Sequence, residues 1–171
     1  MKNELIATFL STALLCTVSC QEVSNNVEES TIDQEIDYEE EKAAILQTLN
    51  NETKAAFRRD YEGWQEKWVH DPAITKTYMN FKDSGFSESV GWNEVSSFVK
   101  TFIEQHPEPE PVPTLLDDID VRLYGDGAWV SYEQQDSLRG LKRETRLMEK
   151  INGQWRIAGM HTTIYGLKKG E

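Results

Sequence analysis

Three histidines and one strand-like run of alternating charges are the parts of this sequence best suited to proton chemistry. Imidazole titrates near neutral pH, and abstraction of a proton next to a carbonyl needs such a base within hydrogen-bond reach of its substrate. His161 lies in an alternating run near the C-terminus, and His70 directly precedes Asp71. His161 and Asp71 are therefore the candidate catalytic residues. Each candidate also has a structural alternative. His161 could be a hydrogen-bonded core or interface histidine, and His70-Asp71 could be a helix end followed by a turn.

A second polar set lies in residues 142–151. Strand alternation puts Glu144 and Arg146 on one face and Arg143 and Glu149 on the other, so neither face is apolar. A charged face either lines a pocket or carries surface ion pairs worth about 0.2–1 kcal/mol each, and we favour surface ion pairs. Residues 21–171 contain no cysteine, which excludes zinc–thiolate sites and thiol catalysis. We expect neither a metal nor a cofactor.

Helical and strand periodicity predict the elements that must position these side chains. Helices are expected at 40–59, 61–68 and 92–106, short strands at 73–80 and 86–90, and longer strands at 115–124, 128–137, 142–151 and 155–165. The Asn152-Gly153 pair favours a type I′ hairpin turn between the last two. Alternation along the last strand then places His161 on the same face as Trp155 and Ile157. This order predicts an α+β fold.

Charge is unevenly distributed along the 171 residues. The formal net charge is −12, and nine acidic residues with no basic residue fall within 20–41. The rest of the chain is nearly balanced and shows no basic stripe, so nucleic acid is not expected as a partner. The acidic stretch is poor in aromatics and is predicted to be a solvated tether. The remaining chain, with five Trp in all, has apolar material for one core.

The N-terminus has the pattern of a targeting segment. Lys2 precedes an apolar run at 5–15, and small residues at 17–19 lead to Cys20. The run is too short to span a bilayer. The pattern resembles a bacterial lipoprotein signal peptide cleaved before Cys20, which would anchor the protein to a membrane of the cell envelope by lipid on Cys20. The alternative is an ordinary secretory signal cut near Ser19, with Cys20 left free. The predicted organisation is a signal peptide (1–19), an acidic tether (20–38) and a folded domain (39–167).

Four short motifs in the folded part resemble a known superfamily. They are Trp64…Trp68-x-x-Asp71, Gly91-Trp92, the Gly-Ala-Trp-Val of 127–130 and the Gly-Gln-Trp-Arg-Ile of 153–157. Together with the element order, they resemble the SnoaL-like, ketosteroid-isomerase-like superfamily named after nuclear transport factor 2, over about residues 40–166. The resemblance implies a conical barrel, with three N-terminal helices packed on a curved, mainly antiparallel sheet. That family includes isomerases, cyclases, dehydratases, transport factors and assembly domains.

The resemblance also implies a pocket between sheet and helices. The family's frequent last-strand histidine corresponds to His161, whereas the catalytic Asp of the isomerases corresponds to Lys76, so the acid–base set is incomplete. The expected pocket residues are Tyr61, Trp64, Trp68, Tyr78, Trp92, Arg146, Trp155 and His161. The structural alternative is that the aromatic residues among them form the core.

Two functional hypotheses follow from these residues. The first is a binding or assembly module, which either holds a small hydrophobic molecule or forms a homodimer through its open sheet face. The second is an enzyme of the isomerase, cyclase or dehydratase type that uses His161. The enzyme hypothesis requires the His161 imidazole and a carboxylate within about 3 Å of each other in a closed cavity.

Overall fold

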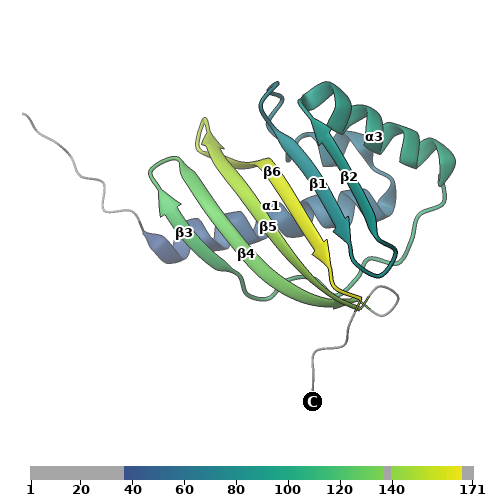
Figure 1. Ribbon diagram of the computed structural model, residues 1–171. Coiled ribbons are helices and arrows are strands. Elements are labelled where there is room, and N and C mark those ends of the chain that lie inside the picture. Colours follow the sequence, from purple (N-terminus) through teal and green to yellow (C-terminus); the bar gives the residue numbers. More distant parts are fainter. Residues whose placement is uncertain (1–36, 137–139, 167–171) are drawn as a thin grey trace, which may run out of the picture. The chain divides into compact units, whose positions relative to one another are not determined.

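The computed structural model describes residues 37–136 and 140–166 (Figure 1). The predicted signal peptide, the lipidation site at Cys20 and all but the last two residues of the predicted tether lie outside the described residues. No helix in the described ranges is long and apolar enough to cross a membrane.

Two helices precede the sheet, as predicted for residues 40–59 and 61–68. Helix α1 (Tyr38–Arg58) begins at Asp37, whose carboxylate accepts hydrogen bonds from the backbone N–H groups of Glu39 and Glu40. It ends at Arg59, which adopts a left-handed conformation. Helix α2 (Tyr61–Gln65) is shorter than expected, and Asp60 caps it through the Gly63 N–H. The buried side of α1 carries Ile45, Leu49, Glu52 and Ala55 at helical spacing.

The six strands form one sheet. They are β1 (Thr75–Asn80), β2 (Gly85–Val90), β3 (Asp120–Tyr124), β4 (Gly127–Asp136), β5 (Gly140–Ile151) and β6 (Gln154–Ile164). The order across the sheet is β2-β1-β6-β5-β4-β3, and every neighbouring pair is antiparallel except β1 and β6. The expected tight turn at Asn152-Gly153 is present, with positive φ at both residues.

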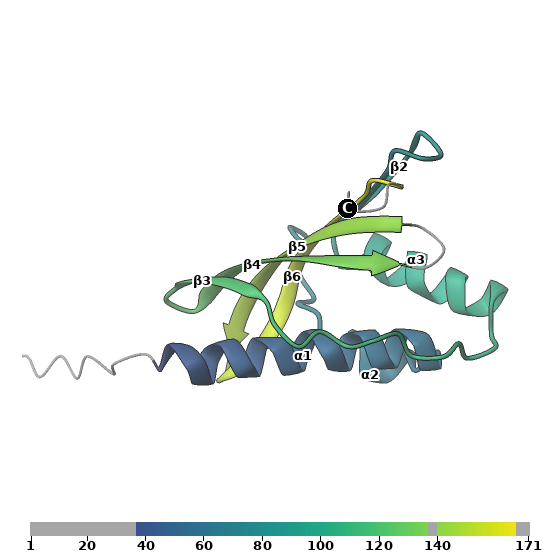
Figure 2. The same cartoon turned by 90° about the horizontal axis from the view of Figure 1, so that it is seen from below.

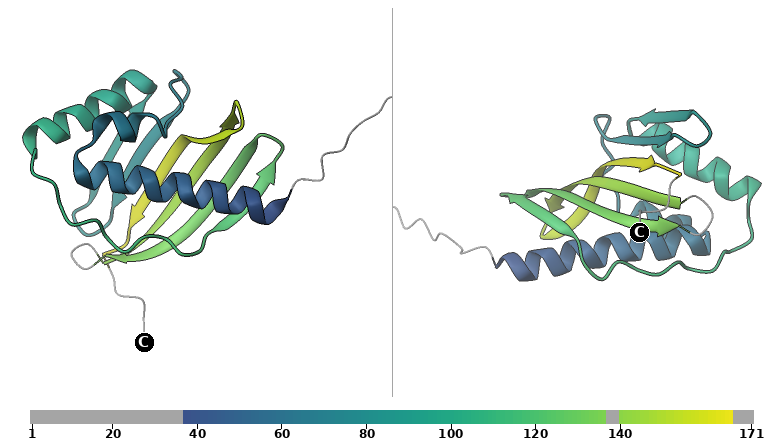
Figure 3. Two further views of the ribbon diagram at one scale, coloured as in Figure 1. Left: turned by 180° about the vertical axis from the view of Figure 1, so that it is seen from behind. Right: turned by 60° about the horizontal axis from the view of Figure 1, so that its bottom comes forward.

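The expected conical barrel needs two corrections. The sheet is open, because within the described residues β2 and β3 each have a neighbour on one side only. In addition, only two helices are N-terminal to the sheet, since α3 (Trp92–Gln105) follows β2. Helix α1 runs along one face of the sheet, with the segment 106–119 beside it (Figure 2). Seen from behind, α1 lies in front of the strands (Figure 3). Figure 1 looks onto the opposite face of the sheet.

The core lies between this inner face of the sheet and the helices. Its largest fully buried side chains include Trp64, Trp68, Ile45, Leu49, Met148 and Ile157. Trp64 is packed between Trp68 and Trp92, at centroid separations of 5.4 and 5.9 Å. Apolar burial of this kind contributes about 1.5–3 kcal/mol for each large side chain, so the tryptophans are major stabilisers of the fold.

A β-bulge in β6 changes which residues face the core. Leu147 of β5 pairs with Gly159, but Met148 pairs with Ile157, so Ala158 is an extra residue in β6. Before the bulge, Trp155 and Ile157 are buried. After it, the buried set is Met160, Thr162 and Ile164. The extra residue reverses the alternation, and His161 therefore lies on the outer face of the sheet.

Candidate functional site

The two candidate catalytic residues are both exposed. His161 lies on the outer face of β6, opposite Thr77 of β1 and Thr145 of β5. Asp71 forms a turn, in which its carboxylate accepts a hydrogen bond from the Ala73 N–H at 2.7 Å. His70 stacks on Trp92 with ring centroids 3.7 Å apart. The closed cavity that the enzyme hypothesis requires is therefore not found at His161, because the bulge turns its side chain away from the core.

A set of charged and polar side chains, most of them buried, occupies the inner face of the sheet. We call it the inner charge cluster and define it as Glu52, Tyr132, Lys142, Glu144 and Arg146. The Glu144 carboxylate is its centre: Arg146 donates to it from Nη2 at 2.6 Å and from Nε at 3.1 Å. Tyr132 donates its hydroxyl at 2.9 Å, and Lys142 donates from Nζ at 2.8 Å to the other carboxylate oxygen. The two oxygens of the Glu144 carboxylate thus accept hydrogen bonds from four donor atoms.

Glu52 connects this cluster to α1. Its Oε1 accepts a hydrogen bond from the Trp64 indole at 2.8 Å, and its Oε2 lies 4.0 Å from Arg146 Nη2. Glu52 is buried because it stands in the apolar stripe of α1, one helical turn after Leu49. A carboxylate at such a position is unfavourable unless it is paired, and the indole and the guanidinium provide the partners.

The cluster corrects the expectation of surface ion pairs on β5. Glu144 and Arg146 are only 5% and 4% exposed, so they are not surface ions. The expectation is confirmed for the opposite face, where exposed Arg143 pairs with Glu133 at 2.7 Å. Sequence reasoning named Glu144 and Arg146 but missed Tyr132 and Glu52 as their partners. The available signal was the acidic residue in the apolar stripe of α1.

Burial and neighbouring charges shift the pKa values of Glu144 and Arg146 in opposite directions. Burial by itself would raise the pKa of Glu144, but the charges of Arg146 and Lys142 outweigh it and hold that pKa at about 2. Burial raises the pKa of the Tyr132 phenol. Burial would lower the pKa of Arg146, yet Tyr132, Glu144 and Glu52 together raise it. At neutral pH Glu144 is therefore ionised and paired with the Arg146 guanidinium.

The expected pocket residues do not line one cavity. Trp64, Trp68 and Trp155 are buried in the core, and Tyr61, Tyr78 and Trp92 are half-buried against it. Arg146 belongs to the inner charge cluster. One cleft of about 380 Å³ lies between α1 and the β5–β6 hairpin. Of the expected pocket residues, Trp155 alone lines this cleft. A second cleft, of about 610 Å³, lies along α1. Among the described residues, no group of His, Cys, Asp and Glu could hold a metal ion.

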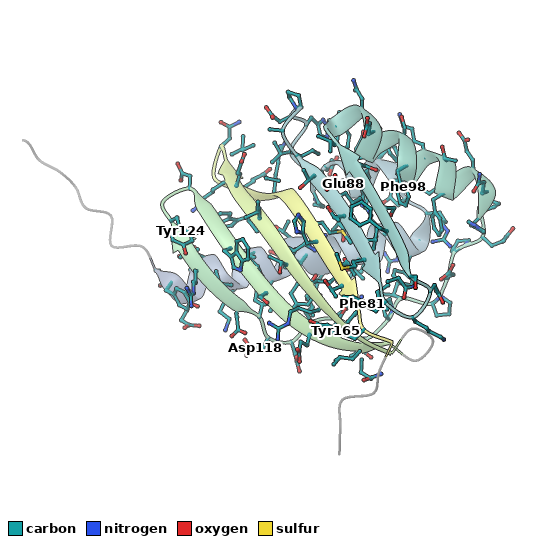
Figure 4. All side chains as sticks on the ribbon, in the orientation of Figure 1. Phe81, Glu88, Phe98, Asp118, Tyr124 and Tyr165 are labelled. Atoms are coloured by element: carbon teal, nitrogen blue, oxygen red, sulfur yellow. The ribbon has the colours of Figure 1, made fainter. Side chains whose placement is uncertain are left out.

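Large apolar side chains gather on the outer face of the sheet. We call this set the outer apolar face; it consists of Met79, Phe86, Val90, Trp129 and Leu147, which are 40–65% exposed. Met79 stands opposite Phe86, and Trp129 stands opposite Leu147. Figure 4 looks onto this side of the sheet and labels Tyr124 on β3 and Glu88 on β2. Clusters of exposed apolar side chains on one face mark interaction surfaces.

Solved structures similar to this chain share its fold. A nuclear transport factor 2-like protein of unknown function from Shewanella oneidensis aligns with a TM-score of 0.52 and 19% identity, over 71% of this chain and 97% of that one. A cystatin-like fold protein from Burkholderia xenovorans gives 0.56 and 18%, over 75% and 92%. A nuclear transport factor 2-like protein of unknown function from Pseudomonas putida gives 0.54 and 18%, over 73% and 87%.

No curated protein matches the sequence significantly. The model of the SnoaL-like domain family matches residues 45–165, which include all six strands and most of α1. This match covers more than half of the chain, and it agrees with the open sheet and with the position of helix α1 along its inner face. The protein therefore belongs to the SnoaL-like domain family.

Proposed function

We propose that this protein is an envelope-anchored lipoprotein whose folded unit is an assembly module, pairing with a second copy through the outer apolar face. The observation that carries the proposal is the set of five large apolar side chains, 40–65% exposed, on a side of the sheet that no described helix covers. Burying such side chains between two copies removes apolar surface from water, which is the main driving force for association.

A second copy is the partner that suits this face. A two-fold interface brings the same patch together with itself, so the patch must be self-complementary. The residues beside the outer apolar face carry both signs of charge, with Glu88 and Glu149 acidic and Arg122 and Arg143 basic. Six strands of these lengths make a face of roughly 25 by 30 Å, close to the roughly 800 Å² per partner of a standard interface.

The small hydrophobic ligand has less support than the second copy. The aromatic side chains that were expected to line its pocket are packed in the core, with Trp64 and Trp68 almost fully buried. The inner face also carries Glu144 and Arg146, and an apolar ligand placed against them would leave charges without solvation. The enzyme alternative also has less support, since His161, its proposed acid–base residue, is exposed on the outer face of the sheet.

The test is the oligomeric state of the purified full-length chain. Sedimentation should show a dimer for the wild type, and Trp129→Glu should weaken it by roughly 100-fold or more, because the new charge would be buried against the partner. Phe102→Glu is the matched control: Phe102 is also 41% exposed but lies on α3, and its variant should remain dimeric. A monomeric wild type at about 100 µM, or equal dissociation of the two variants, would refute the proposal.

A further inference from the structure

A row of polar side chains divides the outer apolar face. The register of the sheet places one residue of each strand in this row, which we call the polar row; from β2 to β3 it consists of Glu88, Thr77, His161, Thr145, Ser131 and Asp120. Thr77 Oγ1 donates a hydrogen bond to Glu88 Oε1 at 3.2 Å. His161 belongs to β6, one of the two central strands of the sheet. Figure 4 looks onto this face and labels Glu88 at one end of the row.

The outer apolar face continues on both sides of the polar row. On one side lie Val90, Leu147 and Trp129, and on the other side lie Met79 and Phe86. Leu147 of β5 stands opposite Gly159, two residues before His161, and Met79 of β1 stands opposite Thr163, two residues after it. Both apolar side chains are therefore diagonal neighbours of His161. A second copy that covers both parts of the outer apolar face must also cover His161.

The surroundings of His161 on this face do not offset a positive charge. The six nearest outer-face positions on the two flanking strands are Thr75, Thr77 and Met79 on β1 and Arg143, Thr145 and Leu147 on β5. Arg143 is the charged residue among these six, and its guanidinium already pairs with Glu133 of β4 at 2.7 Å. At about 4.8 Å for each strand, the backbone of Glu88 lies about 10 Å from that of His161, and the backbone of Asp120 lies about 14 Å away. A protonated His161 would thus lie beside another cation.

We infer that His161 makes the pairing of two copies dependent on pH, so that the dimer forms while the imidazole is neutral and dissociates when it is protonated. The inference rests on the proposed function, because it concerns the regulation of that same face. In a single copy His161 is exposed, so water solvates its imidazole in either state. Under a second copy, a neutral imidazole can form hydrogen bonds with the hydroxyls of Thr77 and Thr145, whereas a covered imidazolium without a carboxylate opposes association.

The direction of the pH dependence follows from this difference. Histidine is the side chain whose charge ordinarily changes between about pH 5 and pH 8. Because the single copy accepts the proton more readily than the dimer does, lowering the pH shifts the equilibrium towards single copies. A dimer covers two His161 side chains, and each should contribute about tenfold between about pH 8 and about pH 5.5, so the dissociation constant should rise roughly 100-fold.

The experiment is sedimentation equilibrium of the full-length chain at about pH 8 and about pH 5.5, at one salt concentration; carboxylates ordinarily titrate near pH 4 and stay ionised in both buffers. A wild type that is dimeric at the higher pH should dissociate at the lower pH. The same dissociation constant at both, or a tighter dimer at the lower pH, would overturn the inference and leave the proposed function intact. A wild type that is monomeric at the higher pH would refute the proposed function, and this inference with it.

Substitution of each histidine assigns the effect. His161→Gln keeps a polar side chain that cannot become charged, so its dissociation constant should change by less than about threefold between the two buffers. The chain has three histidines, and the other two provide matched controls: His70 stacks on Trp92 and His106 packs against Phe102, so both contact α3. His70→Gln and His106→Gln should keep the response of the wild type.

A full response in His161→Gln, or its loss in either control, would refute the role of His161. Circular dichroism at both pH values checks that each variant is folded, and His161→Asn is a second uncharged variant that should behave as His161→Gln does.

Discussion

Replacing Glu144 by Gln should make the stability of the folded unit much less sensitive to acid. The Glu144 carboxylate receives four hydrogen bonds from Tyr132, Lys142 and Arg146 in a buried site. Although burial opposes ionisation, Arg146 and Lys142 hold the pKa of Glu144 at about 2, below its ordinary value of 4.5. The folded state therefore keeps this group ionised at a pH at which the unfolded chain has already bound a proton.

The size of the effect follows from the two pKa values. A fall from 4.5 to about 2 corresponds to about 3 kcal/mol of stability. Because the folded pKa is depressed, this contribution is fully present above about pH 4.5 and is lost as the pH falls towards 2. In Glu144→Gln the contribution is absent at every pH, and near neutral pH the variant also leaves the Arg146 charge poorly compensated. The stability gap between wild type and variant should therefore narrow by about 2–3 kcal/mol between about pH 6 and about pH 2.5.

The assay is urea unfolding followed by tryptophan fluorescence, since Trp64 and Trp68 are buried in the folded state. The control is Glu149→Gln, an identical change on the exposed face of the same strand, whose gap to the wild type should stay within about 0.5 kcal/mol at every pH. A gap for Glu144→Gln that stays constant from about pH 6 to about pH 2.5 would show that Glu144 has an ordinary pKa in the folded state and that the electrostatic account of the cluster is wrong.

Two further predictions concern a glycine and the N-terminal cysteine. Gly91 caps α3 with φ of 80° and ψ of 155°, and a Cβ there would lie 3.2 Å from the Pro72 carbonyl oxygen, so Gly91→Ala should cost about 1–3 kcal/mol in thermal unfolding. Gly85→Ala, where the nearest atom is 3.8 Å away, should cost clearly less, and equal losses would contradict the strain at Gly91. If Cys20 carries the membrane anchor, growth with labelled palmitate should label the wild type and not Cys20→Ala, and a labelled variant would exclude that anchor.

The sequence by itself determined the features that depend on local geometry. The boundary between α1 and α2 and the Asn152-Gly153 turn both rest on interactions within a few residues. The order of helices and strands could also be predicted, because the spacing of apolar residues within a segment depends only on whether that segment is a helix or a strand. These features, together with four short motifs, were enough to identify the family.

Only the tertiary structure decided the features that depend on contacts between two elements, which are the strand register and the burial of charged side chains. His161 was assigned to the wrong face because a bulge is defined by the pairing of β6 with β5, and one extra residue reverses every later side chain. Glu144 and Arg146 were interpreted as surface ions because their partners Tyr132 and Glu52 come from another strand and from α1. A charged side chain can be buried only where partners from elsewhere in the chain compensate it, and a pattern within one strand does not contain that information.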